Sequence, residues 1–232
     1  MKKVLTVVSI ILCCFLLFAC TEKPAENVET PAEPVVHDTI DVYVTFSNAG
    51  ELVLKQEKVT VVDTNDDKKF TAQETFDAFH AANNKEIVVS EGFITKLWSI
   101  ETGGSVLYYV NDVMAGSINE EVKAGDYFYA LILVDGINWS DSYSYFTARS
   151  MNTVKGEEIS FTLKNVGFDA SWNTVIAATE GATITVNGTA TDVVTDANGV
   201  AKITFTEAGT YVISATSTTL TLVPPVCVVT VK

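Results

Sequence analysis

Residues able to supply oxygen ligands recur through the segment 63–74 at the spacing of a twelve-residue calcium-binding loop. In order, the expected ligand positions hold Asp63, Asn65, Asp67, Lys69, Thr71 and Glu74. Calcium needs roughly six to eight hard oxygen atoms at about 2.4 Å, with a bidentate carboxylate at the twelfth position to close the shell. The spacing therefore predicts a calcium site with a structural role and weak affinity.

A metal-free turn is the alternative interpretation of this segment, and it is the favoured one. Lys68 stands at the sixth position, where a calcium loop turns sharply and glycine does so without steric cost. The segment 59–62 predicts a strand, so no helix enters the loop. Thr71 and Glu74, preceded by Phe70, form a capping box that predicts the start of a helix. An Asx-rich turn that only caps this helix would have the same sequence.

Aromatic side chains offer a second kind of site, a stacking platform for a sugar or a corrin ring. The residues expected to face such a ligand are Trp98, Tyr108, Tyr109, Asn111, Trp139 and Tyr143. Trp139 follows Asp135 and Gly136 in an expected loop, so it is the most exposed candidate. Packing in a core or a hairpin is the simpler interpretation for most of the others.

The sequence contains no recognisable catalytic motif. Arg149 is the single arginine, and His80 has no second histidine and no cysteine nearby for a transition-metal site. Cys227 lies in a strand-like run and is expected to be a small buried hydrophobe. The net charge of −14 argues against a nucleic-acid partner. We therefore expect a protein that is not an enzyme and has no certain cofactor beyond the calcium considered above.

The N-terminal residues predict an exported protein. Lys2 and Lys3 precede an uncharged apolar run, 4–18, that is shorter than the ~20 residues a spanning helix needs. The ending Leu17-Phe18-Ala19-Cys20 resembles the lipobox of bacterial lipoproteins. The resemblance implies cleavage of a signal peptide at 1–19 and lipidation, by palmitate among other chains, of Cys20.

Residues 20–37 are expected to form a tether between the lipid and the folded part. The stretch is rich in proline and glutamate and has no aromatic residue, so it cannot bury enough apolar surface to become ordered. We expect the protein to be anchored in the cell membrane or outer membrane and to face outward, at the cell surface.

A first domain is expected over 38–154, with one helix from Thr71. Its expected strands are 39–47, 52–62, 93–100, 106–110, 127–134 and 142–148. Four stretches within 40–148 resemble the transcobalamin C-terminal-like domain, a β-grasp module of bacterial surface proteins. They are Gly92-Phe93, Leu97-Trp98-Ser99-Ile100, Tyr108-Tyr109-Val110-Asn111 and Val122-Lys123-Ala124-Gly125-Asp126. The resemblance implies an α+β β-grasp-like fold.

A second domain is expected over 155–232, where Thr, Val, Ala and Gly dominate and no helical period appears. Its expected strands are 158–163, 174–178, 183–186, 190–195, 201–205, 209–217 and 226–231. Turns at Asn187-Gly188 and Asn198-Gly199 separate them at the spacing of an all-β sandwich. The run 195–215 resembles bacterial immunoglobulin-like domains, which implies a β-sandwich.

These features together predict a non-catalytic binding module at a cell surface. The first expectation is a small ligand, such as a cobalamin-like molecule or a glycan. The alternative is an adhesin or scaffold that contacts another surface protein through sheet edges. In both cases the membrane is a partner through the N-terminal lipid.

Overall fold

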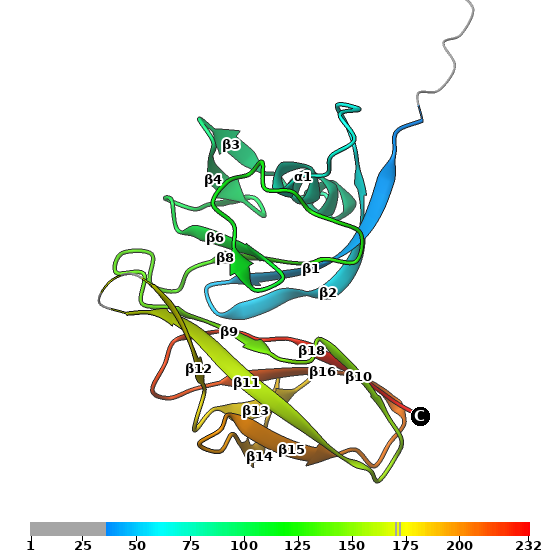
Figure 1. Cartoon of the computed structure of the whole chain (residues 1–232), viewed down its shortest axis with the longest axis vertical. Helices are drawn as coiled ribbons and strands as arrows, with labels where there is room; N and C mark the ends of the chain where they lie inside the picture. The colour runs from blue at the N-terminus through cyan, green and yellow to red at the C-terminus, as the bar shows by residue number, and fades with distance from the viewer. Residues whose placement is uncertain (1–35, 170, 172) are drawn as a thin grey trace, which may run out of the picture. The chain divides into compact units, whose positions relative to one another are not determined.

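The computed structural model describes residues 36–169, 171 and 173–232. The predicted signal peptide, the lipidation site Cys20 and the tether up to residue 35 lie outside these described residues. Residues 36–232 form one compact unit. Its chain is mostly β, with one helix, as Figure 1 shows.

A mixed sheet forms the first half of this unit. In spatial order its strands are β2 (Glu51–Val62), β1 (Thr39–Asn48), β8 (Tyr127–Ile132), β6 (Val106–Val110) and β7 (Val113–Met114). The central strands β1 and β8 run parallel, whereas the other neighbours run antiparallel. Alternation along β1 places Val42, Val44 and Phe46 on one face, where all three are fully buried.

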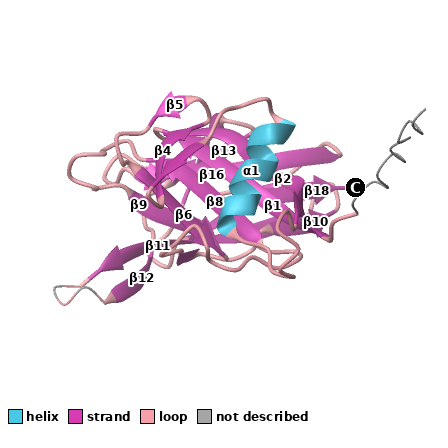
Figure 2. Cartoon of the chain, turned by 90° about the horizontal axis from the view of Figure 1, so that it is seen from above, coloured by secondary structure: helices cyan, strands magenta, loops and turns pink. Residues whose placement is uncertain are grey.

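Helix α1 (Ala72–Ala82) covers that face of the mixed sheet, as seen from above in Figure 2. It begins at the predicted capping box, which is confirmed: Thr71 and Glu74 each bind the other's backbone N–H. Phe76 and Phe79 are fully buried against Phe46 and its neighbours. The helix is thus fixed at its start by polar contacts and along its length by apolar packing.

A small sheet lies beside the helix and comprises β3 (Val88–Ser90), β4 (Phe93–Leu97) and β5 (Ile100–Glu101). The predicted single strand 93–100 is wrong in this respect. Trp98 and Ser99 both have positive φ, 56° and 64°, and make a two-residue turn between β4 and β5. Positive φ at both turn residues is the geometry that matches the twist of a tight hairpin.

Two packed sheets form the second half of the unit, which we call the sandwich. One sheet has the order β10 (Ser150–Thr153), β18 (Cys227–Val231), β16 (Gly209–Thr216), β13 (Thr183–Val186) and β14 (Thr189–Val194). The other has β12 (Thr174–Ala178), β11 (Glu158–Phe168), β9 (Ser142–Phe146) and β17 (Leu222–Val223), and β15 (Val200–Thr204) also pairs with β11. Phe146, Phe161, Ile184, Ile213 and Val229 fill the core between them.

The strands β9 and β10 belong to the sandwich sheets, although our sequence analysis expects the domain boundary near residue 154. β9 pairs with β11 and β17, and β10 pairs with β18. A strand's own alternation does not identify the sheet it joins, because both halves offer partners of the same pattern. The mixed sheet therefore ends at β8, and the chain enters the sandwich before residue 142.

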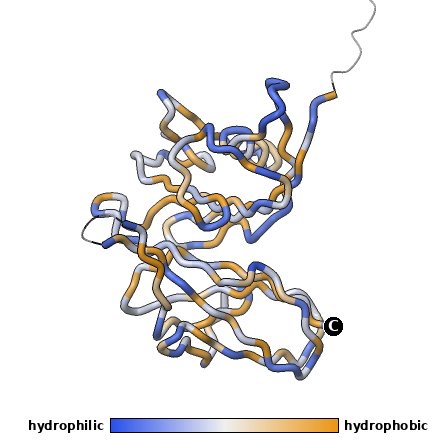
Figure 3. The backbone as a smooth tube through the Cα atoms, in the orientation of Figure 1, coloured by the Kyte–Doolittle hydropathy of each residue, from blue (hydrophilic) through white to orange (hydrophobic). Residues whose placement is uncertain are grey.

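The second face of the mixed sheet packs against the sandwich through a buried cluster that we call the junction. Its members are Tyr109, Tyr129, Leu131, Leu133, Tyr143 and Val223. The Oη of Tyr129 donates to the carbonyl of Pro224 at 2.7 Å, and Gln56 donates to the carbonyl of Val226 at 2.8 Å. Figure 3 shows apolar stretches running through both halves, in contrast to the hydrophilic loop before α1. Within the described residues no helix has the length and apolarity needed to cross a membrane.

Candidate functional site

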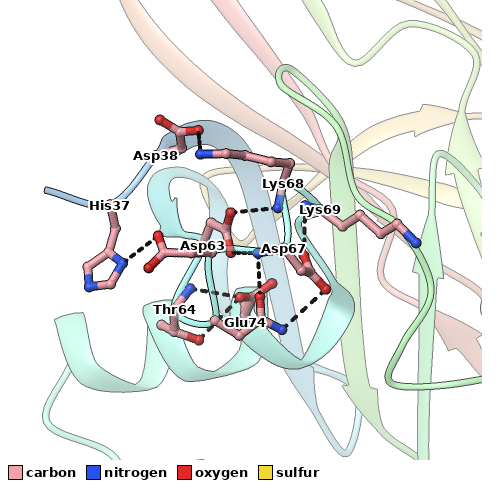
Figure 4. Close-up of polar contacts among 10 residues, drawn as sticks. His37, Asp38, Asp63, Thr64, Asp67, Lys68, Lys69 and Glu74 are labelled. Atoms are coloured by element: carbon pink, nitrogen blue, oxygen red, sulfur yellow. Dashed lines mark hydrogen bonds and ion pairs between the residues drawn. The ribbon is translucent and has the colours of Figure 1, made fainter.

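The loop 63–71 is closed by its own hydrogen bonds (Figure 4). Asp63 is fully buried and accepts from the backbone N–H of Asp67 at 3.2 Å and of Lys68 at 2.9 Å. Asp67 in turn accepts from the backbone N–H of Lys69 at 2.8 Å and from the amide of Asn65 at 3.3 Å. The carboxylates therefore hold the turn in the way an Asx turn does.

Glu74, the predicted bidentate ligand, has both carboxylate oxygens engaged. Its Oε1 accepts from the N–H and hydroxyl of Thr64, at 2.9 and 3.2 Å. Its Oε2 accepts from the N–H and hydroxyl of Thr71, both at 3.0 Å. The side chain is only 6% exposed. Glu74 thus joins the start of the loop to the start of the helix.

Lys68 stands where a calcium loop has glycine, and it adopts the backbone conformation that glycine favours. Its φ is 66°, so a lysine adopts the left-handed conformation at a strain cost of about 1 kcal/mol. Its Nζ lies 2.7 Å from Asp38, and this hydrogen bond lowers the pKa of that carboxyl. Among the described residues no three His, Cys, Asp or Glu side chains gather to hold a metal ion. The geometry favours the capped turn, and calcium binding stays a prediction.

Tyr109 and Tyr143, two of the predicted ligand-facing aromatics, lie inside the junction instead. Their rings stack with centroids 3.6 Å apart and planes 6° from parallel. They are 6% and 3% exposed, so neither can face a ligand. Burial raises the pKa of Tyr109 to about 12 and raises that of Tyr143 as well. The prediction of a ligand-facing role is wrong for both, because the sandwich covers this face of the sheet.

Trp98 and Tyr108 are placed in the packing around α1. The ring of Trp98 lies 5.2 Å from Phe46, and that of Tyr108 lies edge-on to Phe76 at 5.2 Å. Trp139 is 52% exposed, as expected for its loop. The six predicted residues therefore do not form one ligand-facing rim.

Asn111 has a structural role at the end of β6. With Asp112 it makes the two-residue turn into β7, with φ values of 50° and 68°. Its side chain donates to Asp126 at 2.8 Å and accepts from the N–H of Tyr127 at 3.0 Å. A hairpin thus follows the Tyr-Val-Asn stretch even though it contains no glycine.

Arg149 is a residue whose role the sequence analysis missed. Its guanidinium pairs with Asp112 and lies over the rings of Tyr127 at 5.3 Å and Tyr145 at 5.8 Å. Asp112 also accepts from the hydroxyl of Tyr143 at 2.9 Å. The single arginine therefore connects both halves at the edge of the junction, where a planar cation can pair and stack at once.

His80 and Cys227 are both buried, and burial of Cys227 is what the sequence predicts. His80 Nε2 accepts from the N–H of Trp98 at 2.9 Å, and Nδ1 lies 2.7 Å from the carbonyl of Phe76. Burial lowers the pKa of His80, which favours the neutral ring that both contacts require. Burial also raises the pKa of the Cys227 thiol to about 12, so this cysteine is not a reactive thiolate.

A groove of about 500 Å³ opens beside the junction, and we call it the junction groove. Its lining residues in the mixed-sheet half are Gly50, Glu51, Leu52, Lys55 and Val134. Its lining residues in the sandwich are Thr185, Gly188, Val212, Ser214, Ala215, Thr216, Ser217, Leu220, Thr221, Leu222 and Pro224. Its volume lies in the range of pockets that take small ligands. Both halves are needed to form it.

The floor of the junction groove carries paired hydroxyls. Thr185 of β13 and Ser214 of β16 are directly opposite in the antiparallel register, so their side chains project from the same face of the sheet. That face is the outer one, because Ile184 and Ile213 next to them lie in the sandwich core. The sequence shows the two-residue alternation that turns these side chains outward. It does not show that the first half of the chain lies over this face of the sheet.

Comparisons with known proteins assign no family. No family model matches the chain, and no curated protein matches it. Among solved structures, the N-terminal four Ig domains of Dscam1 isoform 4.44 align with 87% of this chain at 9% identity and a TM-score of 0.25. This chain spans 47% of that one. The tandem Ig repeats of Dlar align with 85% of this chain and all of their own, at 9% identity and the same TM-score, 0.25. Both are immunoglobulin repeats, and such TM-scores assign neither fold nor function to this chain.

Proposed function

We propose that this protein is a lipid-anchored, extracytoplasmic binding protein that holds a small ligand in the junction groove. The observation that carries the proposal is the groove itself, which is of ligand size and is built jointly by the two halves of the folded unit. Binding rather than catalysis is favoured because no charged residue other than Glu51 and Lys55 lines it.

The first half of the unit is proposed to be a β-grasp module like the transcobalamin C-terminal-like domain. The sheet order β2-β1-β8-β6-β7, with a parallel central pair and one helix after the first hairpin, supports this assignment. The sandwich is proposed to be immunoglobulin-like on the strength of its two packed antiparallel-rich sheets. The covered sheet face, however, argues that any ligand binds at the groove and not on the open sheet.

The anchor is proposed to be lipid on Cys20, on the basis of the lipobox resemblance. The whole chain would be expressed in a bacterium fed an alkyne-labelled fatty acid. Label on the wild type and on a Cys13→Ser/Cys14→Ser control, but not on Cys20→Ser, is expected. Label that survives in Cys20→Ser would contradict the anchor.

The groove is tested by ligand-observed and protein-observed NMR with a library of small polar fragments and cobalamin. Fragments are expected to perturb the amides of 50–55 and 212–222. Leu52→Arg, which places a long charged side chain in the groove, should abolish these shifts, while Lys58→Glu on the same strand but outside the groove should not. A library that leaves the groove amides unperturbed would refute the proposal.

A contact role is the second candidate function, and β12 favours it. This strand is at the edge of its sheet, and its Val175 and Ile176 are 45% and 57% exposed. An apolar edge without charge can accept an extended segment of another protein by strand addition. Figure 2 shows the β11–β12 hairpin extending away from the rest of the sandwich.

Cell adhesion is the appropriate test of that second role. Cells displaying the wild type and cells displaying Ile176→Lys would be compared for binding to a matrix of surface proteins, with Lys164→Glu as a control on the neighbouring strand. Loss of adhesion in Ile176→Lys alone would support the contact role. Equal adhesion of all three would reject it.

A further inference from the structure

The two hydroxyls on the floor of the junction groove have no hydrogen-bond partner among the described residues. Thr185 is 7% exposed and Ser214 is 6% exposed, so both are more than nine-tenths buried. Several other buried hydroxyls are bound to the protein: Thr195 donates to the carbonyl of Thr179 at 2.6 Å, and Ser144 to that of Val223 at 2.7 Å. Among the described residues no fully buried side-chain polar atom lacks a partner, so the hydroxyl oxygens of Thr185 and Ser214 are open to the groove.

An unpaired hydroxyl in a confined site is a recognition element for a polar ligand. A ligand that displaces water from the groove must supply a partner to each hydroxyl, because burying a hydroxyl without a partner is unfavourable. Each hydroxyl can donate one hydrogen bond and accept others, so the pair suits a ligand that offers both donors and acceptors. Further hydroxyls of the lining belong to Thr216, Ser217 and Thr221.

The charges around the groove favour a neutral ligand. Glu51 and Lys55 are its charged lining residues, both are exposed, and their charges are opposite. The chain's net charge of −14 also disfavours anions. Leu52, Leu222 and Pro224 supply apolar wall surface against which the C–H face of a ligand can pack.

An extended peptide fits the groove less well than a compact ligand. Two edge strands line the groove, β2 and β17, and β17 has only two residues, too few for strand addition. On β2, Gln56 interrupts the edge with a φ of 58°, and a register shift between β1 and β2 lies nearby. Its side chain also crosses to the carbonyl of Val226. A bulge and a crossing side chain both prevent a continuous ladder of backbone hydrogen bonds.

We propose that the junction groove binds a neutral saccharide, one or two sugar units long, through the hydroxyls of Thr185 and Ser214. A sugar ring has hydroxyls that both donate and accept, which suit the hydroxyls of Thr185 and Ser214. It carries no charge, which suits the opposite charges of Glu51 and Lys55. Its apolar C–H face suits the apolar wall of the groove. This inference rests on the proposed function, since it names the ligand class of the same groove.

Calorimetry on the full chain in detergent micelles tests the inference. The probes are maltose, cellobiose, mannobiose and N,N′-diacetylchitobiose, with glucosamine and glucuronic acid as charged counterparts. At least one neutral sugar is expected to bind. Thr185→Val and Ser214→Ala are each expected to weaken it about three- to tenfold. Thr185→Ser, which keeps the hydroxyl, and Thr210→Val, an exposed position on β16 outside the groove, should leave the affinity unchanged.

Two results would overturn the inference: no binding of any neutral sugar, or sugar binding that Thr185→Val and Ser214→Ala leave unchanged. Ser214→Ala only removes an atom, so it gives the readout even where Thr185→Val fails to fold. The fragment screen separates the two proposals. A non-saccharide that perturbs the groove amides while all sugars fail leaves the groove as a binding site and rejects its ligand class.

Discussion

The loop 63–71 and the junction groove contrast in how their polar atoms are satisfied. The loop has the denser set of carboxylates, but Asp63 and Glu74 accept hydrogen bonds from the loop's own backbone and threonines. The groove has hydroxyls in place of a carboxylate cluster, and no hydrogen bond to the described part of the chain engages those of Thr185 and Ser214, which open to the groove. The density of polar residues in a sequence therefore says less about a binding site than which polar groups stay accessible and free of protein partners after folding.

The largest expected effect comes from removing the centre of the loop's network. Glu74→Ala should lower the free energy of unfolding by about 3 kcal/mol, because four donors of Thr64 and Thr71 lose the buried carboxylate that accepts from all of them. Urea denaturation measures it, with Glu57→Ala, an exposed position on β2, as the control that should change stability little. A change under about 1 kcal/mol in Glu74→Ala would show that the loop is not held by this carboxylate.

The same substitution in the two regions gives the sharpest comparison. Thr71→Val should cost about 1 kcal/mol, since it removes the N-cap hydroxyl of α1. Thr185→Val should be neutral or slightly stabilising, because it replaces an unpaired hydroxyl by a methyl group of similar size. Equal losses of stability in both variants, measured by thermal and urea unfolding, would mean that Thr185 has a partner in the folded protein.

Acidification should lower the free energy of unfolding by less than Glu74→Ala or Thr71→Val, and the effect should arise in the packing around α1. Burial lowers the pKa of His80, so the folded state favours the neutral ring. Its contribution to stability is present above the ordinary histidine pKa of about 6.5 and is lost as the pH falls below that value. The urea midpoint should therefore drop between pH 7 and pH 5 more in the wild type than in His80→Gln. Parallel curves for the two proteins would reject this role of His80.

The smallest effect is expected from calcium. Because Asp63 and Glu74 already accept hydrogen bonds within the loop, adding a chelator or millimolar calcium should leave the melting temperature unchanged. A calcium-dependent rise in melting temperature that disappears in Asp63→Ala would instead restore the calcium interpretation of 63–74.

Much of the local structure could be predicted from sequence, because local patterns determine it. The capping box at Thr71 and Glu74 and the turn at Asn187-Gly188 depend on neighbours a few residues away, and both are observed. The sheet that β9 joins could not be predicted, because its partners β11 and β17 lie elsewhere in the chain.

The candidate site was less predictable for the same reason. Tyr109 and Tyr143 look like a ligand platform until the sandwich is placed against the sheet and stacks them together. Thr185 and Ser214 are ordinary strand residues in the sequence. They line a groove only because the β1–β2 turn, more than a hundred residues earlier, lines it with them.

Amide chemical-shift mapping during titration with the neutral disaccharides tests the central claim most directly. The account predicts saturable shifts at Thr185, at 212–217 and at 50–55, with the amides of 63–74 unmoved. Shifts confined to the loop 63–74, or spread over residues that do not line the junction groove, would contradict it.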